Sequence, residues 1–236
     1  MRNALDRPTP TVEDYLQEIY DLLGDGKSVI AARLAERIGV SAPTAWATLQ
    51  RMQRDELVEL AEKHEIHLTD KGKDAAESIK RRHFLAERLL VDILGLDWAD
   101  AHEEAHRIEH AVSPLVEERI NKLLGNPTTC PHGNPMPGAP HPATVLLATL
   151  QEGDERAIDG VQEDAEEDAE LMRFLQQNGM TPGTRLRVVE VASFNSTMTI
   201  EVDGRRVVLG IPAAECVRVL DPASATQGAA AKASAR

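Results

Sequence analysis

The sequence predicts a mainly α protein with a small amount of β-structure. It is expected to hold an N-terminal winged helix-turn-helix, a helical dimerisation domain and a small C-terminal β-barrel. Three observations support this fold class. Apolar residues recur at helical spacing through most of residues 11–123. A proline-rich stretch follows at 127–142, and short alternating apolar runs occupy 184–220.

The start of the chain is expected to form three short helices and a hairpin. Apolar periodicity defines the helices, glycines end the first two, and two alternating runs form the hairpin. These elements span residues 11–23, 28–39, about 43–55, 57–60 and 65–69. Ser41 is the expected N-cap of the third helix, and Pro43 fits its first turn. This order predicts a winged helix-turn-helix, with a small α+β bundle as the alternative.

Two longer helical segments follow, at 72–96 and 98–123. Pro114 lies near the middle of the second segment, so a new helix is expected to start at Ser113. The two segments carry more apolar surface than a single three-helix domain needs to bury. A homodimer interface is the expected cover for that surface.

The remainder of the chain changes character twice. Residues 127–142 contain six of the 13 prolines and are expected to form a stiff connector. Residues 144–178 are acidic and expected to be partly helical, whereas 184–220 form short strands with a hairpin turn at Asp203–Gly204. The predicted domains are 1–74, 75–142 and 143–222, followed by a disordered tail at 223–236.

The composition and charge of the chain restrict the functions and the cellular location that can be expected for it. The net charge is −13, and residues 1–80 hold 11 Lys and Arg against 15 Asp and Glu. DNA binding would therefore need a local basic patch, helped by a cation that neutralises carboxylates. Neither a transmembrane helix nor a secretory signal is expected. The two cysteines, Cys130 and Cys216, form no CxxC pair, which favours a cytoplasmic protein.

Histidines and carboxylates gather between residues 83 and 110 in a pattern typical of metal sites. His83 and Glu87 share one helix face. The next helix presents four such residues within an arc of roughly 100°. These four are His102, His106, Glu109 and His110. Metal–ligand bonds are about 2 Å long, whereas the ends of this array lie roughly 10–12 Å apart, so two sites are expected.

The residues fall into two expected ligand sets. The first set is Asp14, His106, Glu109 and His110. The second set is His83, Glu87 and His102. Cys130 and an acid from 163–170 could complete the second site. A solvated helix face is the alternative for the histidine cluster, and an apolar filler is equally favoured for Cys130.

A metalloenzyme and a DNA-independent metal buffer on a helical scaffold are the alternative functions. A catalytic metal needs an open coordination position and a nearby acid or base. No nucleophile motif, phosphate loop or substrate cradle accompanies these residues, and an enzyme would leave the helix-turn-helix unexplained. An enzyme is therefore not expected.

Several long segments of the chain, in order, carry a family resemblance. They are EDYLQEIYDL, RLAERIGVSAPTAWATLQRMQRDELVEL, LTDKG, RRHFLAERLLVDILGLD, HEEAHRIEHAVS and GNPMPG. From about residue 11 to 138, and more loosely beyond, the chain resembles the DtxR/MntR family of metal-dependent transcriptional regulators. The resemblance implies a homodimeric repressor of metal-uptake genes that binds a palindromic DNA operator. It also implies activation by Mn(II) or Fe(II) and an SH3-like C-terminal domain.

The resemblance also implies ligands. It assigns the first set to a primary site and the second to an ancillary site, with third-domain ligands best matched by Glu167 and Glu170. Some members place a cysteine of a TCPHG string here, which matches Cys130. Iron-type members carry sulfur ligands where this chain has Asp14 and His106, whereas manganese-type members share the Asp. Hard oxygen ligands favour Mn(II), with Fe(II) as the alternative. Zn(II), Co(II), Ni(II) or Cd(II) are expected to bind in vitro.

The third helix is expected to enter the major groove of DNA. The candidate contacts on its exposed face are Ser41, Pro43, Thr44, Ala47 and Thr48. The candidate phosphate contacts are Arg51, Arg54 and Lys63. Small apolar groups read thymine methyls, and hydroxyls bond phosphates or base edges. Trp46 either contacts DNA or packs on the second helix.

Overall fold

The structure, a computed structural model, describes residues 7–24, 26–61 and 65–222. The chain divides into two compact units. The first unit holds the residues up to His83 together with Glu109–Ser113, and the second holds Phe84–Ile108 and the residues from Pro114 onward. The predicted DNA contact Lys63 and the predicted disordered tail lie outside the described residues.

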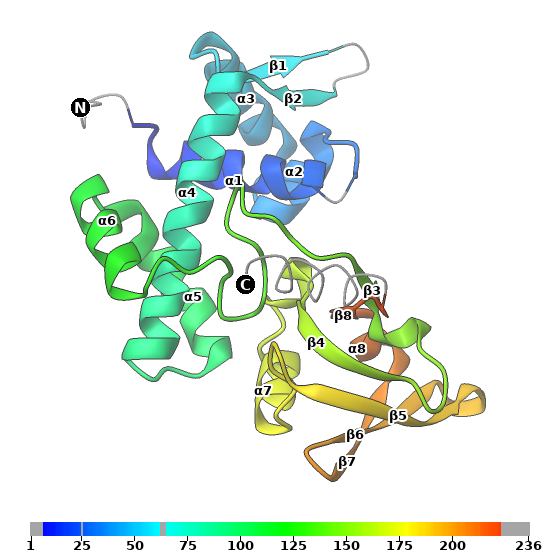
Figure 1. The fold of residues 1–236 in the computed structure, drawn as a ribbon. Helices are drawn as coiled ribbons and strands as arrows, with labels where there is room; N and C mark the ends of the chain where they lie inside the picture. Colours follow the sequence, from blue (N-terminus) through cyan, green and yellow to red (C-terminus); the bar gives the residue numbers. More distant parts are fainter. Residues whose placement is uncertain (1–6, 25, 62–64, 223–236) are drawn as a thin grey trace, which may run out of the picture. The chain divides into compact units, whose positions relative to one another are not determined.

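The first unit confirms the predicted winged helix-turn-helix (Figure 1). Its elements are α1 (Pro10–Gly24), α2 (Ala31–Ile38), α3 (Ala42–Arg54), β1 (Val58–Leu60), β2 (Ile66–Leu68) and most of α4 (Asp70–Arg88). Apolar side chains at the predicted helical positions form one core, including Leu16, Leu34 and Leu49. Ser41 caps α3 as expected, because its hydroxyl accepts a hydrogen bond from the backbone N–H of Thr44.

The second helix begins later than predicted, at Ala31 rather than near residue 28. The backbone N–H of Ile66 donates to the carbonyl of Val29 at 2.9 Å, and Ile30 bridges Glu65. The β-branched pair Val29–Ile30 therefore extends the sheet of the wing instead of starting a helix.

Helix α4 begins in tight contact with the segment before the wing. A Cβ atom on Gly72 would lie 1.9 Å from the carbonyl oxygen of Leu57. That oxygen also accepts a hydrogen bond from the backbone N–H of Thr69 at 3.1 Å. Only glycine allows this approach of helix to backbone.

The helical segments after residue 88 follow the predicted order. They are a π-helical turn at Leu89–Ile93, α5 (Trp98–Ile108), a 3-10 turn at Glu109–Ala111, and α6 (Pro114–Leu123). The new helix expected near Pro114 is present, with Ser113 immediately before it.

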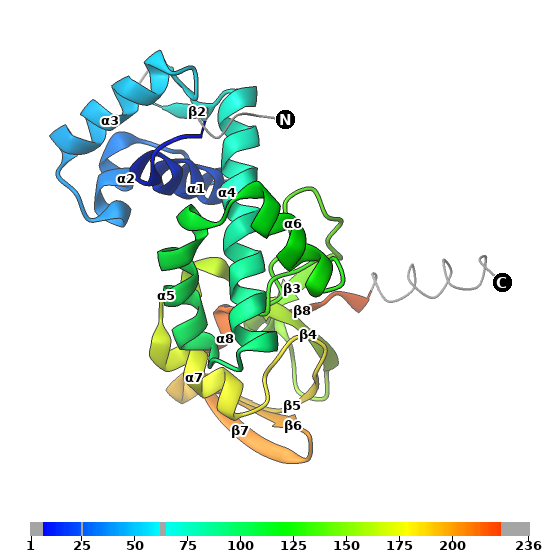
Figure 2. The ribbon, with the colours of Figure 1, turned by 90° about the vertical axis from the view of Figure 1, so that its left-hand side faces the viewer.

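The second unit contains a six-stranded antiparallel sheet in the order β3-β8-β4-β5-β6-β7 (Figure 2). The strands are β3 (Thr144–Leu146), β4 (Glu155–Val161), β5 (Arg185–Ala192), β6 (Thr197–Val202), β7 (Arg205–Gly210) and β8 (Val217–Leu220). Helices α7 (Ala169–Gln177) and α8 (Ile211–Glu215) accompany the sheet. The sheet is larger than predicted, because β3 and β4 lie in the acidic stretch that was expected to be partly helical.

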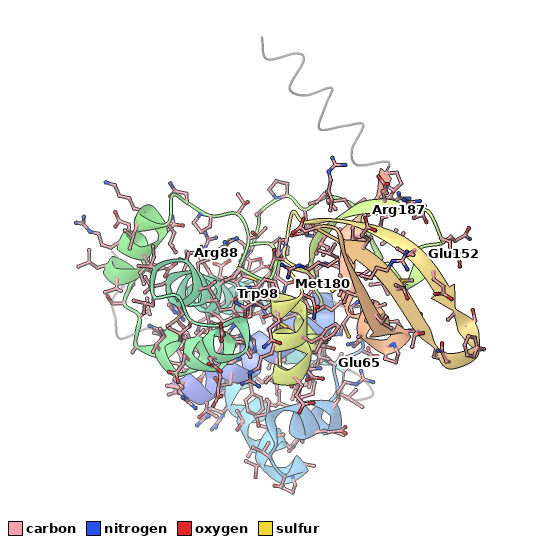
Figure 3. The ribbon with its side chains drawn as sticks, turned by 90° about the horizontal axis from the view of Figure 1, so that it is seen from below. Glu65, Arg88, Trp98, Glu152, Met180 and Arg187 are labelled. Carbon is pink, nitrogen blue, oxygen red and sulfur yellow. The ribbon has the colours of Figure 1, made fainter. Side chains whose placement is uncertain are left out.

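The core of the second unit joins α5 to the sheet. Trp98, at the start of α5, shares this core with Met180 and with inward residues of β5 and β6 (Figure 3). Its backbone N–H donates to the side-chain oxygen of Gln176 on α7 at 2.9 Å. This packing ties the histidine-bearing helix α5 to the C-terminal part of the unit.

The proline-rich connector runs along β4 in direct backbone contact. The backbone N–H of Val161 donates to the carbonyl of His132 at 2.9 Å. A Cβ atom on Gly133, whose φ is +94°, would lie 2.1 Å from the carbonyl oxygen of Asp159. A Cβ atom on Gly160 would lie 2.4 Å from the carbonyl oxygen of His132. Two glycines therefore permit the contact.

Among the described residues, no helix is both long and apolar enough to cross a membrane.

Candidate metal centres

Three predicted ligands converge in the first unit. Asp14 lies on α1, and Glu109 and His110 lie in the 3-10 turn that follows α5. His110 Nε2 lies 3.0 Å from Asp14 Oδ1 and 3.5 Å from Glu109 Oε1. One donor atom from each residue falls within 4.8 Å of the others. We call these three residues the first centre.

Glu13 orients the imidazole of the first centre. His110 Nδ1 lies 2.7 Å from Glu13 Oε2, and Glu13 is only 2% exposed. A proton on Nδ1 that is donated to this carboxylate leaves the lone pair of Nε2 facing Asp14 and Glu109. Carboxylate–histidine pairs of this kind hold metal-binding imidazoles in proteins. Two oxygen donors and one nitrogen donor fit a divalent ion such as Mn(II) or Fe(II).

Two arginines hold Glu13 in turn. Arg82 Nη2 and Arg7 Nε donate to Glu13 Oε1 at 2.7 and 2.6 Å. Arg7 also donates to the carbonyls of Glu109 and Val112, which fixes the turn that carries the ligands. Glu13 was not predicted from the sequence, because one helix alone does not reveal which of two adjacent acids turns inward.

Two other predicted ligands, His106 and His83, lie in a different unit from the residues with which they were grouped. His106 lies in the second unit, so its expected junction with the first centre stays a prediction. His83, predicted for the ancillary site, places Nδ1 2.6 Å from Glu109 Oε2 within the first unit. Its expected junction with Glu87 and His102 stays a prediction for the same reason.

A second group of donor atoms is buried in the second unit. His102 Nδ1 lies 2.8 Å from Glu87 Oε1 and 3.2 Å from Glu166 Oε2. His132 Nδ1 lies 3.1 Å from Glu166 Oε2 and 3.5 Å from Glu87 Oε1. The fully buried Sγ of Cys130 lies within 4.8 Å of donor atoms of Glu87 and His132. We call these five residues the second centre.

The buried charges shape the pKa values of the second centre. Burial opposes the charged form of His132, but the charges of Glu166 and Glu87 outweigh it and hold its pKa well above the ordinary value. Burial raises the pKa of Glu166, but the charge of His132 and the hydrogen bonds of His102 and His132 together outweigh burial, so the net pKa is lowered. Burial, then the charges of Glu166 and Glu87, raises the pKa of the Cys130 thiol to about 11.

The raised pKa values of His132 and Cys130 indicate that this site favours positive charge. Two carboxylates buried together repel each other, and a cation relieves that repulsion. Imidazole, carboxylate and thiol donors suit Fe(II), Co(II) or Zn(II). The donor set therefore fits a transition metal.

The third-domain carboxylate of this group is Glu166, whereas the predicted ligands Glu167 and Glu170 lie outside the group and stay predictions. Both of those side chains are exposed, whereas Glu166 is 2% exposed. The acidic run is not one helix. A 3-10 turn ends at Ala165, and Asp168 caps α7, so only Glu166 turns inward beside Ala165. His132 was also missed, although it stands two positions after Cys130 in the TCPHG string.

The predicted DNA-binding face of α3 is mostly exposed. The exposed members are Ser41, Pro43, Thr44, Ala47, Arg51 and Arg54. Thr48 is 9% exposed and buried beside the core, which corrects its predicted place on this face. Trp46 is partly buried and packs against the core of the first unit, which favours the packing alternative for this residue.

Comparison with known families matches nearly the whole chain. Residues 8–66 match the N-terminal DNA binding domain of iron dependent repressors. Residues 69–138 match the metal binding and dimerisation domain of iron dependent repressors. Residues 145–220 match the FeoA domain.

Individual relatives agree with these matches. The chain is 41% identical to the iron-dependent repressor IdeR of Mycobacterium leprae over 191 residues, covering 75% of this chain and 83% of that protein. It is 36% identical to the diphtheria toxin repressor of Corynebacterium efficiens, covering 89% and 94%. A solved manganese-dependent transcriptional repressor in complex with manganese is similar with a TM-score of 0.78 and 34% identity. That similarity covers 89% of this chain and 99% of the other.

Proposed function

The chain belongs to the family of iron-dependent repressors, and we propose that it represses transcription when a divalent metal ion occupies the first centre. The observation that carries this proposal is the convergence of Asp14, Glu109 and His110 within the unit that contains the helix-turn-helix. The second centre would bind a further ion through its buried carboxylates, imidazoles and thiol.

The residues of the first centre suggest how a bound metal would change the arrangement of the first unit, which contains the helix-turn-helix. Asp14 belongs to α1, whose Val12 and Leu16 are part of the core of the first unit. Glu109 and His110 belong to a turn distant in sequence. A bound divalent ion neutralises the carboxylates and holds them together. Without it, the negative charges of Asp14 and Glu109 repel each other, which favours other arrangements of α1 relative to the turn. A ligand that binds one arrangement more tightly shifts the population toward it.

The physiological metal is proposed to be Mn(II), with Fe(II) as the alternative. Two carboxylates and one imidazole make the first centre rich in hard oxygen ligands, which supports Mn(II). Relatives named for iron and for manganese are both similar to this chain. Zn(II), Co(II), Ni(II) and Cd(II) are expected to bind in vitro, because ligand affinity alone selects weakly among these ions.

The partners are proposed to be a palindromic double-stranded operator and a second copy of this chain in the cytoplasm. The exposed face of α3 offers apolar contacts for thymine methyls at Pro43 and Ala47, and hydroxyls at Ser41 and Thr44. Arg51 and the other exposed arginine of α3, Arg54, offer local positive charge in an acidic chain.

Fluorescence anisotropy with labelled DNA tests the proposal. The DNA is taken from upstream of this gene and of neighbouring metal-transporter genes. The protein is titrated in EDTA, then with Mn(II), with anaerobic Fe(II) and with Zn(II). Tight binding only with metal is expected, and Asp14→Asn should abolish the metal response. The matched control is Asp100→Asn, an exposed carboxylate of the second unit, which removes the same charge and should leave the response intact.

Other outcomes of this experiment are equally informative. Equal binding with and without metal would leave a DNA-binding protein and refute the switch. Metal uptake with no DNA binding to genome-wide fragments would favour the metal-buffer alternative. Metal-dependent turnover without DNA binding would favour an enzyme.

A further inference from the structure

Arg88 joins the two chain segments that carry most of the second centre. It is the last residue of α4 and follows Glu87 directly. Its side chain is labelled in Figure 3 and reaches the turn that carries Cys130 and His132. The two segments are far apart in sequence, so their relative placement depends on such contacts.

The guanidinium of Arg88 makes three hydrogen bonds to this turn. Nε donates to the carbonyl of Thr129 at 2.9 Å. Nη2 donates to the hydroxyl of Thr129 at 3.0 Å and to the carbonyl of Cys130 at 3.0 Å. A planar fork with donors in fixed directions suits this set of acceptors, whereas a lysine ammonium offers a single point charge.

The far side of the turn is fixed as well. The backbone N–H of Asn134 donates to Cys130 Sγ at 3.3 Å, and its amide donates to Glu166. The carbonyl of His132 is held by β4, as described above. The turn is therefore clamped between α4 on one side and the sheet on the other, and Arg88 provides the α4 side.

We propose that Arg88 is a positioning residue that sets the second centre by fixing Cys130 and His132 relative to Glu87. This role rests on the proposed metal binding of the second centre. A contribution of Arg88 to the stability of the whole fold explains its contacts less well than this positioning role. The Arg88 side chain is 25% exposed, its other partner Asp92 is 39% exposed, and exposed ion pairs contribute little. The three directed hydrogen bonds to one turn instead fix the position of that turn relative to α4.

Co(II) binding to the full-length protein tests this role by spectroscopy. A thiolate–cobalt charge-transfer band reports Cys130 at the metal, and Cys130→Ser identifies that band by its loss. Arg88→Gln is expected to weaken Co(II) affinity, followed through this band, by roughly tenfold to a hundredfold, the usual cost of losing an outer-shell partner. Arg88→Lys should keep the charge but recover only part of the affinity.

The control is Arg173→Gln, which removes an exposed arginine of the same unit that pairs with exposed Asp100 at 3.3 Å. It should leave the band and the affinity unchanged. Circular dichroism of each metal-free variant verifies folding, and if Arg88→Gln does not fold, Arg88→Lys carries the comparison.

Two results would overturn the proposal, and they differ. A wild-type band that Arg88→Gln and Arg88→Lys reproduce in intensity and affinity would refute the role of Arg88 alone. A wild-type protein without any thiolate band would refute metal binding by Cys130 and the role of Arg88 together.

Discussion

Replacing Glu13 with glutamine tests the buried ion-pair network of the first unit. Glu13 accepts hydrogen bonds from Arg82, Arg7 and His110 at 2.6–2.7 Å. Glutamine keeps the shape of the side chain but removes its charge. It also replaces one acceptor oxygen with an amide group that can only donate.

The expected loss of stability follows from the exposure of the partners. Removing one charge of a buried ion pair costs about 3–5 kcal/mol, because the other charge stays buried without compensation. The Arg7 side chain is 26% exposed, so water screens its share, whereas the Arg82 side chain is only 5% exposed. The lower end of the range, about 3 kcal/mol, is therefore expected for Glu13→Gln.

Urea unfolding followed by tryptophan fluorescence measures this loss. The background variant Trp98→Phe leaves Trp46, in the first unit, as the only tryptophan of the chain. At a urea slope of about 2 kcal/mol per M, the unfolding midpoint should fall by about 1.5 M in EDTA. Glu36→Gln on the exposed side of α2 is the matched control and should change stability by less than about 0.5 kcal/mol.

A loss below about 1 kcal/mol for Glu13→Gln would refute the reasoning, since that is the range of exposed ion pairs. It would mean that the arginines do not depend on Glu13 for their charge balance.

Three further predictions concern other parts of the chain. In the same urea assay, Gly72→Ala should lose about 1–3 kcal/mol by overpacking against Leu57, whereas Gly24→Ala, with open space around its Cβ, should not. His106→Ala should abolish metal-stimulated DNA binding by anisotropy yet leave the dimer intact by size-exclusion chromatography; a full metal response would refute its assignment. Since metal displaces the thiol proton of Cys130, whose pKa is about 11, Co(II) affinity should rise with pH up to that value. Cys130→Ser should show a shallower rise, and an equal rise would contradict this.

The sequence predicted the helical framework because its signals are local. Periodic apolar residues, glycine stops and the Ser41 cap define α1 to α3 without reference to the rest of the chain. The start of α2 was wrong because Val29 and Ile30 pair with a strand more than 30 positions away. The strand β4 was missed because its charged residues interrupt the apolar alternation that marks strands. The strand β3 has only three residues, which is too short for an alternation to show.

Candidate metal-binding residues are most readily predicted where they share one segment. Spacing along one segment identifies His102 and His110 as candidates. His132 and Glu166 become visible only when distant segments meet, because an inward turn in a loop has no periodicity. Glu13 lies on a helix, but its partners Arg82 and His110 come from distant parts of the chain. Thr48 shows the opposite error, a polar residue assigned to the surface that packs beside the core.

The backbone contact between the connector and β4 limits how this sequence can diverge. At Gly133 and Gly160 the missing side chains are what the contact requires, since the Cβ of either would collide with the backbone that carries the other. A side chain at either position would therefore separate the turn from β4. The sequence could lose these glycines only if the turn that holds Cys130 and His132 moved away from the sheet.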